Sequence, residues 1–323
     1  GASIIGEIRE ANNMSTVVET TELDKPRQDI IDFLANFTAE TTPFSAAKVE
    51  DFREVLRPGS TVFITFLPGS NFDDTIAVAA RLRKEGFNPV PHLAARSIPS
   101  ATFLDENLGK LRDAAGINEV LTIAGAVDEP VGEFSDSMQV LNTGLMDKHG
   151  IKKIGVAGHP EGSPDMSDKA IASALKWKND FAARSNAELY VVTQFCFEVE
   201  PIITWDKAMR AAGNSLPIRI GIPGIATIKT LLNYSKACGI GNSIDFLKKQ
   251  ARNVAKLMTV SAPDKLIYDL ASYKATDPEC GLIGCHMYPL GGVKKTAKWT
   301  YAVIDGEFKM SSNGKGFRLT REI

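Results

Sequence analysis

Short apolar runs alternate with stretches of helical periodicity from residue 37 almost to the end of this chain. The runs occupy residues 37–42, 61–66, 89–93, 119–124, 153–158, 188–194, 217–222 and 281–288. Strands of this kind have both faces buried, and helices between them produce a parallel sheet with the helices outside. Eight such units in fewer than about 300 residues are the size of a (β/α)8 barrel. We therefore predict an α/β chain with the TIM-barrel fold.

An open, doubly wound sheet is the competing fold for the same alternation. It would place a Gly-rich dinucleotide fingerprint after the first strand, whereas residues 41–43 read Thr-Thr-Pro. We expect the barrel to cover residues 24–290. Residues 1–23, which are polar and rich in Thr and Glu, are expected to form an N-terminal arm. Residues 291–323, with a strand-like run at 299–304, would form a C-terminal extension.

Composition limits the partners of this chain. Of its 323 residues 44% are hydrophobic, and the formal net charge of −2 gives no basic surface for nucleic acid. No apolar run is long enough to cross a bilayer, and residues 1–13 lack the apolar core of a signal peptide. We expect a soluble, cytoplasmic protein without a membrane partner. The four cysteines have no metal-binding spacing and are expected as free thiols.

Glu40 is the candidate catalytic acid. It lies near the end of the first predicted strand, which stops at Pro43 and leads into a helical pattern at residues 49–56. In a parallel α/β barrel the carboxyl ends of the strands carry the catalytic groups. A solvated glutamate at a strand end is the alternative, which this stretch alone leaves open.

Other polar and aromatic groups follow predicted strands and would share the rim with Glu40. They are Thr65, His92, the loop 125–128, His159, Glu161, Gln194, Phe195, the turn 223–224, His286 and Tyr288. The set contains no metal-ligand triad, no nucleophile beside a base and no Walker loop. A rim with one acid and many hydrogen-bonding groups suits a flat heteroaromatic ligand and chemistry supplied by a cofactor.

Several of these residues also have plain structural explanations. His92 could be a core histidine satisfied by the backbone, and Phe195 could serve packing. Gln194 closes an apolar strand and needs a partner, which is either a ligand or the backbone. Lys178, together with Lys176, has the spacing of a solvated helix face.

The order of the motifs resembles the methylenetetrahydrofolate reductase family. The matching segments are residues 39–43 (Ala-Glu-Thr-Thr-Pro), 91–93 (Pro-His-Leu), 157–162 (Ala-Gly-His-Pro-Glu-Gly), 193–198 (Thr-Gln-Phe-Cys-Phe-Glu), 222–225 (Ile-Pro-Gly-Ile) and 286–290 (His-Met-Tyr-Pro-Leu). Each segment is short, but their order and spacing from about residue 36 to 290 are specific.

The resemblance implies a barrel that binds FAD at its rim and exchanges hydride with NAD(P)H. The reduced flavin would convert 5,10-methylenetetrahydrofolate to 5-methyltetrahydrofolate, a step of one-carbon metabolism and methionine biosynthesis. Glu40 would donate the proton that opens the folate ring, and would need a raised pKa to do so. The flavin contacts would come from Thr65, His92, Gly125, Ala126, Ser135, His159, Glu161 and Lys178. The folate or nicotinamide contacts would come from Gln194, Phe195, Asp128 and Tyr288.

One departure from the family pattern follows the fourth predicted strand. The family usually has Arg-Gly-Asp there, whereas residues 124–126 read Ala-Gly-Ala, so both charges are absent. Asp128 would replace the carboxylate only if the loop bends differently; otherwise it is a structural turn residue. The departure keeps a second hypothesis open, a folate-binding barrel that acts in one-carbon or methyl transfer without tightly bound flavin. The sequence also leaves a homo-oligomer open.

Overall fold

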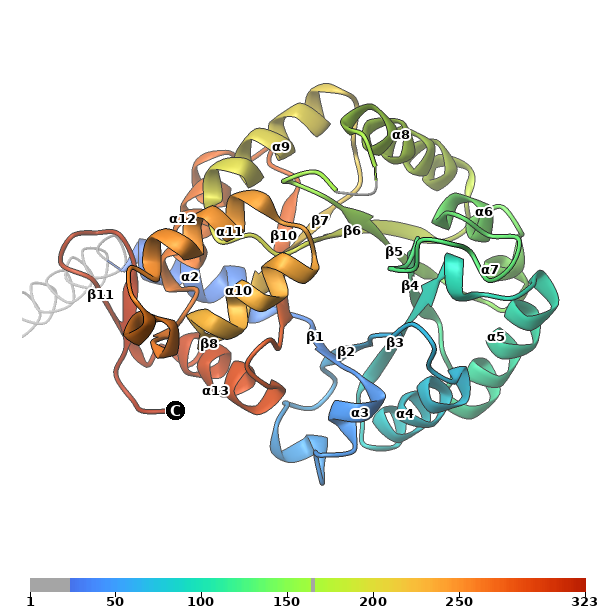
Figure 1. The fold of residues 1–323 in the computed structure, drawn as a ribbon, viewed down its shortest axis with the longest axis horizontal. Helices are drawn as coiled ribbons and strands as arrows, with labels where there is room; N and C mark the ends of the chain where they lie inside the picture. The colour runs from blue at the N-terminus through green and yellow to red at the C-terminus, as the bar shows by residue number, and fades with distance from the viewer. Residues whose placement is uncertain (1–23, 164–165) are drawn as a thin grey trace, which may run out of the picture.

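The computed structural model describes residues 24–163 and 166–323, so the arm predicted at 1–23 lies outside the described residues. Eight parallel strands form one sheet in the order β1-β2-β3-β4-β5-β6-β7-β10. They are β1 (Ala39–Thr41), β2 (Thr61–Ile64), β3 (Asn88–Ala94), β4 (Glu119–Ile123), β5 (Lys153–Gly158), β6 (Glu188–Thr193), β7 (Ile218–Pro223) and β10 (Leu282–Tyr288). Figure 1 shows these strands at the centre of the molecule with the helices around them.

The sheet closes through a single residue that precedes β1. Thr38 N donates to Cys285 O at 3.0 Å, and Met287 N donates to Thr38 O at 2.9 Å. The seam between β1 and β10 is short because β1 has only three residues. The predicted (β/α)8 barrel is therefore confirmed, with β1 and β10 joined by one parallel bridge.

Helices lie outside the sheet, most of them in the outer layer of the barrel and two of them in an insertion at its rim. They are α2 (Lys25–Ala35), α3 (Pro43–Ala46), α4 (Phe72–Lys84), α5 (Ala101–Ala115), α6 (Ser137–Leu141), α7 (Leu145–Lys148), α8 (Asp168–Arg184), α9 (Val199–Ala211), α10 (Ile228–Ala237), α11 (Gly241–Gln250), α12 (Asp264–Thr276) and α13 (Val293–Ile304). Within the described ranges, no helix has the length and apolar character needed to span a membrane.

The helix boundaries follow local chemistry. The sequence predicts a helix over 167–184 with Ser167 as its cap, and Ser167 accepts a hydrogen bond from Ala170 N; Ser100 caps α5 in the same way. Gly116 ends α5 with a φ of 58°, a left-handed conformation in which glycine carries no Cβ penalty. The two largest outer helices therefore begin and end where the sequence indicates.

Three local predictions were wrong. The sequence also predicts one helix over 135–149, but the structure splits it into α6 and α7, because Gly144 between them has a φ of 75°. The strand-like run at 299–304 lies in α13, whose small and aromatic residues are buried at helical spacing. The helical pattern at 49–56 is only a 3-10 turn, Phe52–Glu54, after the short α3. The tail instead forms an antiparallel hairpin, β11 (Phe308–Met310) with β12 (Phe317–Leu319).

An apolar layer fills the middle of the barrel lumen. It consists of the side chains Phe63, Val90, Leu121, Tyr190 and Val192. Gly155 makes room for one of these rings, since a Cβ there would lie 3.0 Å from Tyr190 Cζ. The layer separates the carboxyl-end rim, where Glu40 lies, from the amino-terminal mouth of the barrel.

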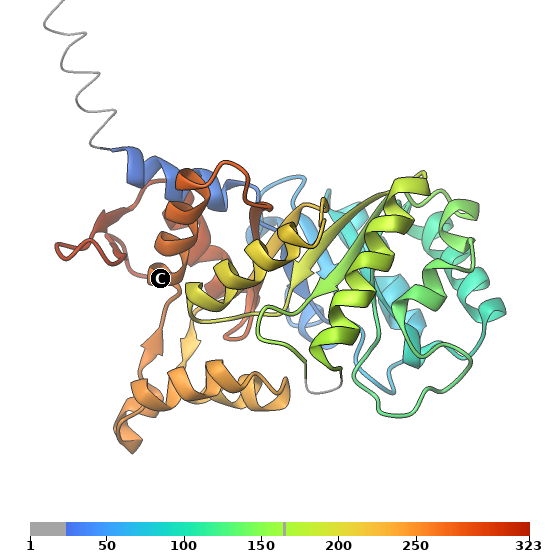
Figure 2. The ribbon, with the colours of Figure 1, turned by 90° about the horizontal axis from the view of Figure 1, so that it is seen from above.

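An insertion follows β7 at the carboxyl-end rim. It contains α10, α11, a 3-10 segment (Val254–Met258) and the antiparallel pair β8 (Ala226–Thr227) and β9 (Val260–Ser261). It has its own apolar cluster around Leu231 and Leu247. Figure 2 shows the insertion, in yellow-orange, standing off from the barrel body.

Candidate active site

Glu40 meets two histidines inside the carboxyl end of the barrel. Its Oε1 lies 3.2 Å from His286 Nε2 on β10 and 3.4 Å from His92 Nε2 on β3. All three side chains are nearly or fully buried. The carboxylate therefore faces the lumen, and the solvated-acid alternative does not describe it.

Thr38 fixes the orientation of this cluster. It lies two residues before Glu40, on the same face of the extended chain, and its Oγ1 is 2.7 Å from His286 Nδ1. The arrangement fits a neutral imidazole whose Nδ1 accepts from the Thr38 hydroxyl and whose Nε2–H donates to Glu40. Each polar atom of His286 thus has one partner.

The structure gives Glu40 a low pKa, opposite to the direction that the resemblance implies. Burial alone would raise it, but the hydrogen bond from His286 and the proximity of His92 outweigh burial and lower the pKa to about 2. Burial also lowers the pKa of His286, which supports its neutral form. At neutral pH the cluster is therefore a carboxylate held by a neutral imidazole.

Buried polar atoms without partners lie beside the cluster. His92 Nδ1 and Thr65 Oγ1 form no hydrogen bond with any other residue of the described chain, and His92 Nε2 faces only Glu40 Oε1, at 3.4 Å. Buried polar atoms are almost always satisfied, so such a pair at a strand end indicates a ligand. In the same ranges no group of three or more His, Cys, Asp and Glu side chains is placed to hold a metal ion.

The sequence places Lys176 and Lys178 together on a solvated helix face. In the structure only Lys176 is exposed, and Lys178 on α8 is buried. Lys176 is exposed and pairs with Asp180 at 3.0 Å, whereas the Lys178 side chain is 6% exposed. Burial lowers the pKa of Lys178 to about 8, and the charge of Asp136 opposes this only in part. Lys178 lines a cavity of about 30 Å³ together with His159.

Arg96 holds the loop that follows β4. Its Nε donates to Ser135 O at 2.9 Å and its Nη1 to Val127 O at 3.2 Å. Gly125, with a φ of 99°, packs so closely that a Cβ there would lie 3.3 Å from Ala94 Cβ. The loop is therefore organised by an arginine from the neighbouring β3 connection, which the sequence analysis did not identify.

The predicted site residues of this loop lie at the surface. Ala126 and Asp128 are exposed, and the Asp128 carboxylate forms no ion pair or hydrogen bond with another described residue. Ser135 uses both its amide and its hydroxyl on Gln139 Oε1, at 2.6 and 3.1 Å. The structure does not join Asp128 to the Glu40 cluster by any direct contact.

Aromatic side chains form one wall beside the cluster. The Tyr288 ring lies edge-on to His286 at 4.7 Å, and Phe195 lies edge-on to Tyr288 at 5.7 Å. Tyr288 donates its hydroxyl to Thr193 O at 3.0 Å, and burial raises its pKa well above the usual value. Among the described residues, Gln194 Oε1 accepts from Phe195 N alone, at 3.3 Å, and the Gln194 amide nitrogen donates to none of them, so it is available to a ligand.

Glu161 attaches the insertion to the rim. Its Oε1 accepts from Ser243 N at 3.0 Å and its Oε2 from Ser243 Oγ at 2.8 Å, in the first turn of α11. Burial raises the pKa of this carboxyl group. Both carboxylate oxygens are thus occupied by α11, whose first-turn N–H groups lack intrahelical partners.

Replacing Glu161 with alanine should loosen α11. Loss of a capping acceptor costs about 1 kcal/mol, so amide exchange in α11 should become about fivefold faster. Hydrogen exchange read by mass spectrometry measures this directly. Glu188→Ala, an exposed substitution on β6, is the matched control. Unchanged exchange in α11 of the Glu161 variant would refute the attachment.

Comparisons with known proteins identify the family of the chain. The sequence model of the methylenetetrahydrofolate reductase family matches residues 47–290. Methylenetetrahydrofolate reductase 1 of Schizosaccharomyces pombe is 38% identical over 88 residues, which are 27% of this chain and 14% of that protein. Methylenetetrahydrofolate reductase 2 of Saccharomyces cerevisiae is 37% identical over 120 residues, 37% of this chain and 18% of that protein.

A solved structure shares the fold. It is an uncharacterized protein from Clostridium thermocellum, described as binding two copies of 5-methyl-5,6,7,8-tetrahydrofolic acid, with a TM-score of 0.52 and 13% identity. The alignment covers 85% of this chain and 98% of that one. The matches to the two yeast proteins span less than a fifth of their lengths. Because the family model covers most of the barrel, this chain belongs to the methylenetetrahydrofolate reductase family.

Proposed function

We propose that the chain is a flavin-dependent oxidoreductase that interconverts 5,10-methylenetetrahydrofolate and 5-methyltetrahydrofolate with NAD(P)H. Family membership supports this reaction class. The observation that carries the proposal is the buried Glu40 carboxylate between two imidazoles at the carboxyl end of the barrel.

The residues at the rim fit a flavin. Thr65 and His92 offer buried polar atoms that lack protein partners, and Lys178 offers a buried amine that suits a phosphate oxygen. Bound FAD would supply hydride transfer between the nicotinamide and the folate. We assign the remaining flavin contacts to Gly125, Ala126, Ser135, His159 and Glu161, and the folate contacts to Gln194, Phe195, Asp128 and Tyr288.

Glu40 can become a proton donor when a ligand engages His92. Burial is the largest influence on its pKa and acts upward, while contacts with the two histidines act downward. A ligand that forms hydrogen bonds with the His92 nitrogens would weaken the contact of His92 with Glu40, and by excluding water it would strengthen the effect of burial. Both changes would raise the pKa of Glu40. The proton then held at Glu40 Oε1 would pass to the folate nitrogen as the ring opens.

An FAD titration of the purified protein tests the flavin part of this proposal. We expect saturable binding with the spectrum of protein-bound flavin, followed by bleaching when NADH or NADPH is added without oxygen. Lack of saturable binding would overturn the flavin assignment.

The Lys178→Met variant should bind FAD at least about tenfold more weakly, since a desolvated ammonium–phosphate contact is worth about 1.5–3 kcal/mol. Lys176→Met, two residues away on the same helix and exposed, should bind FAD like the wild type. The same titration measures both variants. Equal affinities for the two would remove Lys178 from the cofactor site.

The loop after β4 favours a second candidate function, a folate-binding barrel in methyl transfer without tightly bound flavin. Ala126 and Asp128 are exposed there, and neither contributes a charge that contacts the Glu40 cluster. The Clostridium thermocellum neighbour is described as binding a methylated folate. Tight binding of 5-methyltetrahydrofolate, with no FAD binding and no NADH oxidation, would favour this candidate.

A further inference from the structure

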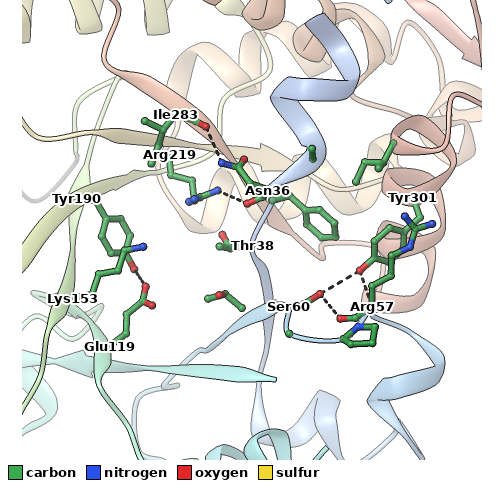
Figure 3. A pocket seen from close by; sticks show the side chains of 16 residues that line it. Asn36, Thr38, Arg57, Ser60, Glu119, Lys153, Tyr190, Arg219, Ile283 and Tyr301 are labelled. Atoms are coloured by element: carbon green, nitrogen blue, oxygen red, sulfur yellow. Dashed lines mark hydrogen bonds between the residues drawn. The ribbon is translucent and has the colours of Figure 1, made fainter. Parts of the chain in front are cut away.

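A second cavity opens at the amino-terminal mouth of the barrel, on the opposite side of the apolar layer from Glu40. Its volume is about 330 Å³, which is large enough for a small metabolite. It lies where β2, β4, β5 and β7 begin, and Figure 3 shows Glu119, Lys153, Tyr190 and Arg219 on one side of it and Arg57, Ser60 and Tyr301 on the other. The charged and hydroxyl groups that define it are Arg57, Ser60, Glu119, Lys153, Tyr190 and Arg219.

Arg219 is a buried cation in this cavity that forms no salt bridge with a described residue. It is 8% exposed, and its Nη1 donates to Asn36 O at 2.8 Å and to Cys285 O at 3.2 Å. No other described residue accepts from its Nε or Nη2, and no described carboxylate oxygen lies within 4.0 Å of the guanidinium. Buried charges are normally paired in direct contact, whereas Glu119, the carboxylate of this cavity, acts on Arg219 only from a longer distance.

The one carboxylate of the cavity is already occupied. Glu119 Oε1 accepts from Asn88 Nδ2 at 3.0 Å, and Oε2 accepts from the Tyr190 hydroxyl at 2.6 Å. Lys153 Nζ lies over the Tyr190 ring, 5.2 Å from its centre, at the mouth of the cavity. Two cations therefore share the cavity with one carboxylate, and free donors outnumber free acceptors.

The remaining arginine of the lining is neutralised elsewhere. Arg57 Nη2 pairs with Asp305 at 2.6 Å and its guanidinium stacks on Tyr301. The excess positive charge thus belongs to Arg219 and Lys153, which come from β7 and β5. Figure 3 shows Arg219 and Lys153 on the same side of the cavity, with Tyr190 beside them.

A local irregularity of β10 makes room for the arginine. The pairing of β10 with β7 shifts register between Leu282 and Gly284. A Cβ at Gly284 would overlap Asn36 Oδ1 and would lie 3.2 Å from Arg219 Nη1. Glycine at this position therefore lets Asn36 and Arg219 meet at the cavity wall.

We propose that this amino-terminal cavity binds a small oxyanion, a phosphate or carboxylate group of a metabolite, through Arg219 and Lys153. A guanidinium with free Nε and Nη2 donors presents the fork that matches two oxygens of such a group. The ammonium of Lys153, at the start of β5, adds a second contact at the amino-terminal mouth of the barrel. The bound oxyanion would accept hydrogen bonds from Nε and Nη2 of Arg219, which have no acceptor among the described residues.

Isothermal titration of the full chain tests the site, with inorganic phosphate and succinate as separate probes at constant ionic strength. We expect saturable binding of at least one probe, and the probe that binds distinguishes phosphate from carboxylate recognition. Arg219→Gln and Lys153→Met should each weaken that binding by at least about tenfold. Lys152→Met, the exposed neighbour, should leave it unchanged.

Lys153 is exposed, so its variant remains informative even if the buried Arg219→Gln substitution prevents folding. No saturable binding of either probe, or equal affinity in the Lys153→Met and Lys152→Met variants, would overturn the proposal. FAD titration of the same variants should match the wild type, because the cavity lies at the opposite end of the barrel from the proposed flavin contacts. The oxyanion titration therefore tests the amino-terminal cavity whether or not the protein binds FAD at the carboxyl-end rim.

Discussion

Substituting glutamine for Glu40 should slow folate reduction by about 10²–10⁴-fold, the contribution of a positioned acid–base group. Glutamine keeps the size of the side chain and accepts a hydrogen bond from His286, but cannot deliver the proton. Reduction of bound flavin by NADH needs no such proton from Glu40, so its rate should stay within a few-fold of the wild type. Stopped-flow measurement of the two half-reactions separates these effects.

The matched control is Glu106→Gln, an exposed substitution on α5, which should leave both half-reactions unchanged. If the Glu40 variant reduced folate as fast as the wild type, Glu40 would not be the proton donor. Equal loss in both half-reactions would instead point to a damaged flavin site.

The second large effect concerns His286, whose replacement by leucine should reverse the pH dependence that Glu40 gives to folding. The wild-type carboxyl group has its pKa lowered from 4.5 to about 2. A depressed pKa stabilises the folded state above pH 4.5, by about 3 kcal/mol, and this contribution is lost as the pH falls toward 2. Without His286 only His92 opposes burial, which is the largest influence, and we expect the pKa of Glu40 to rise above 4.5.

A raised pKa reverses the direction in which Glu40 makes the free energy of unfolding depend on pH. Glu40 would then favour folding below pH 4.5, and this contribution would be lost as the pH rises through its new value. At neutral pH the variant should be less stable by about 3–5 kcal/mol, because an uncompensated carboxylate stays buried. Urea unfolding at a series of pH values from 4 to 8 measures how the free energy of unfolding changes with pH.

The double variant, Glu40→Gln with His286→Leu, provides the control. Removing the charge as well as its partner should recover part of the lost stability. A double variant less stable than His286→Leu alone, or a single variant with the wild-type pH slope, would contradict this account of the cluster.

The barrel could be predicted because its evidence is local. Alternating apolar runs and helical stretches are properties of neighbouring residues, and parallel packing follows from the alternation. The same reasoning failed at 299–304, where an apolar run with aromatic and β-branched residues has strand propensity but is buried as a helix in α13. Packing against the rest of the barrel overrides propensity there.

The environment of Glu40 could be predicted only in part. Its position at a strand end was predictable, but its partner His286 is 246 residues away in the sequence. The low pKa depends on His286 and His92, which closure of the barrel brings to Glu40, and Thr38 orients the His286 ring. The position of Thr38, two residues before Glu40, was the available signal, since both face the lumen.

Lys178 and Arg219 show a second limit of sequence analysis. The spacing of Lys178 from Lys176 indicates one solvated face, yet the first is buried and the second exposed. Arg219 stands in the apolar run 217–222, and an arginine in a buried strand is a signal for a polar cavity that the sequence analysis did not use. Only the three-dimensional structure shows that Arg219 forms no salt bridge with a described residue.

The most direct test of the proposed reaction is anaerobic mixing of the flavin-loaded, reduced protein with 5,10-methylenetetrahydrofolate, followed through the flavin absorbance. We expect the flavin to be reoxidised with formation of one 5-methyltetrahydrofolate per flavin. A flavin that stays reduced in the presence of excess folate would contradict the assignment.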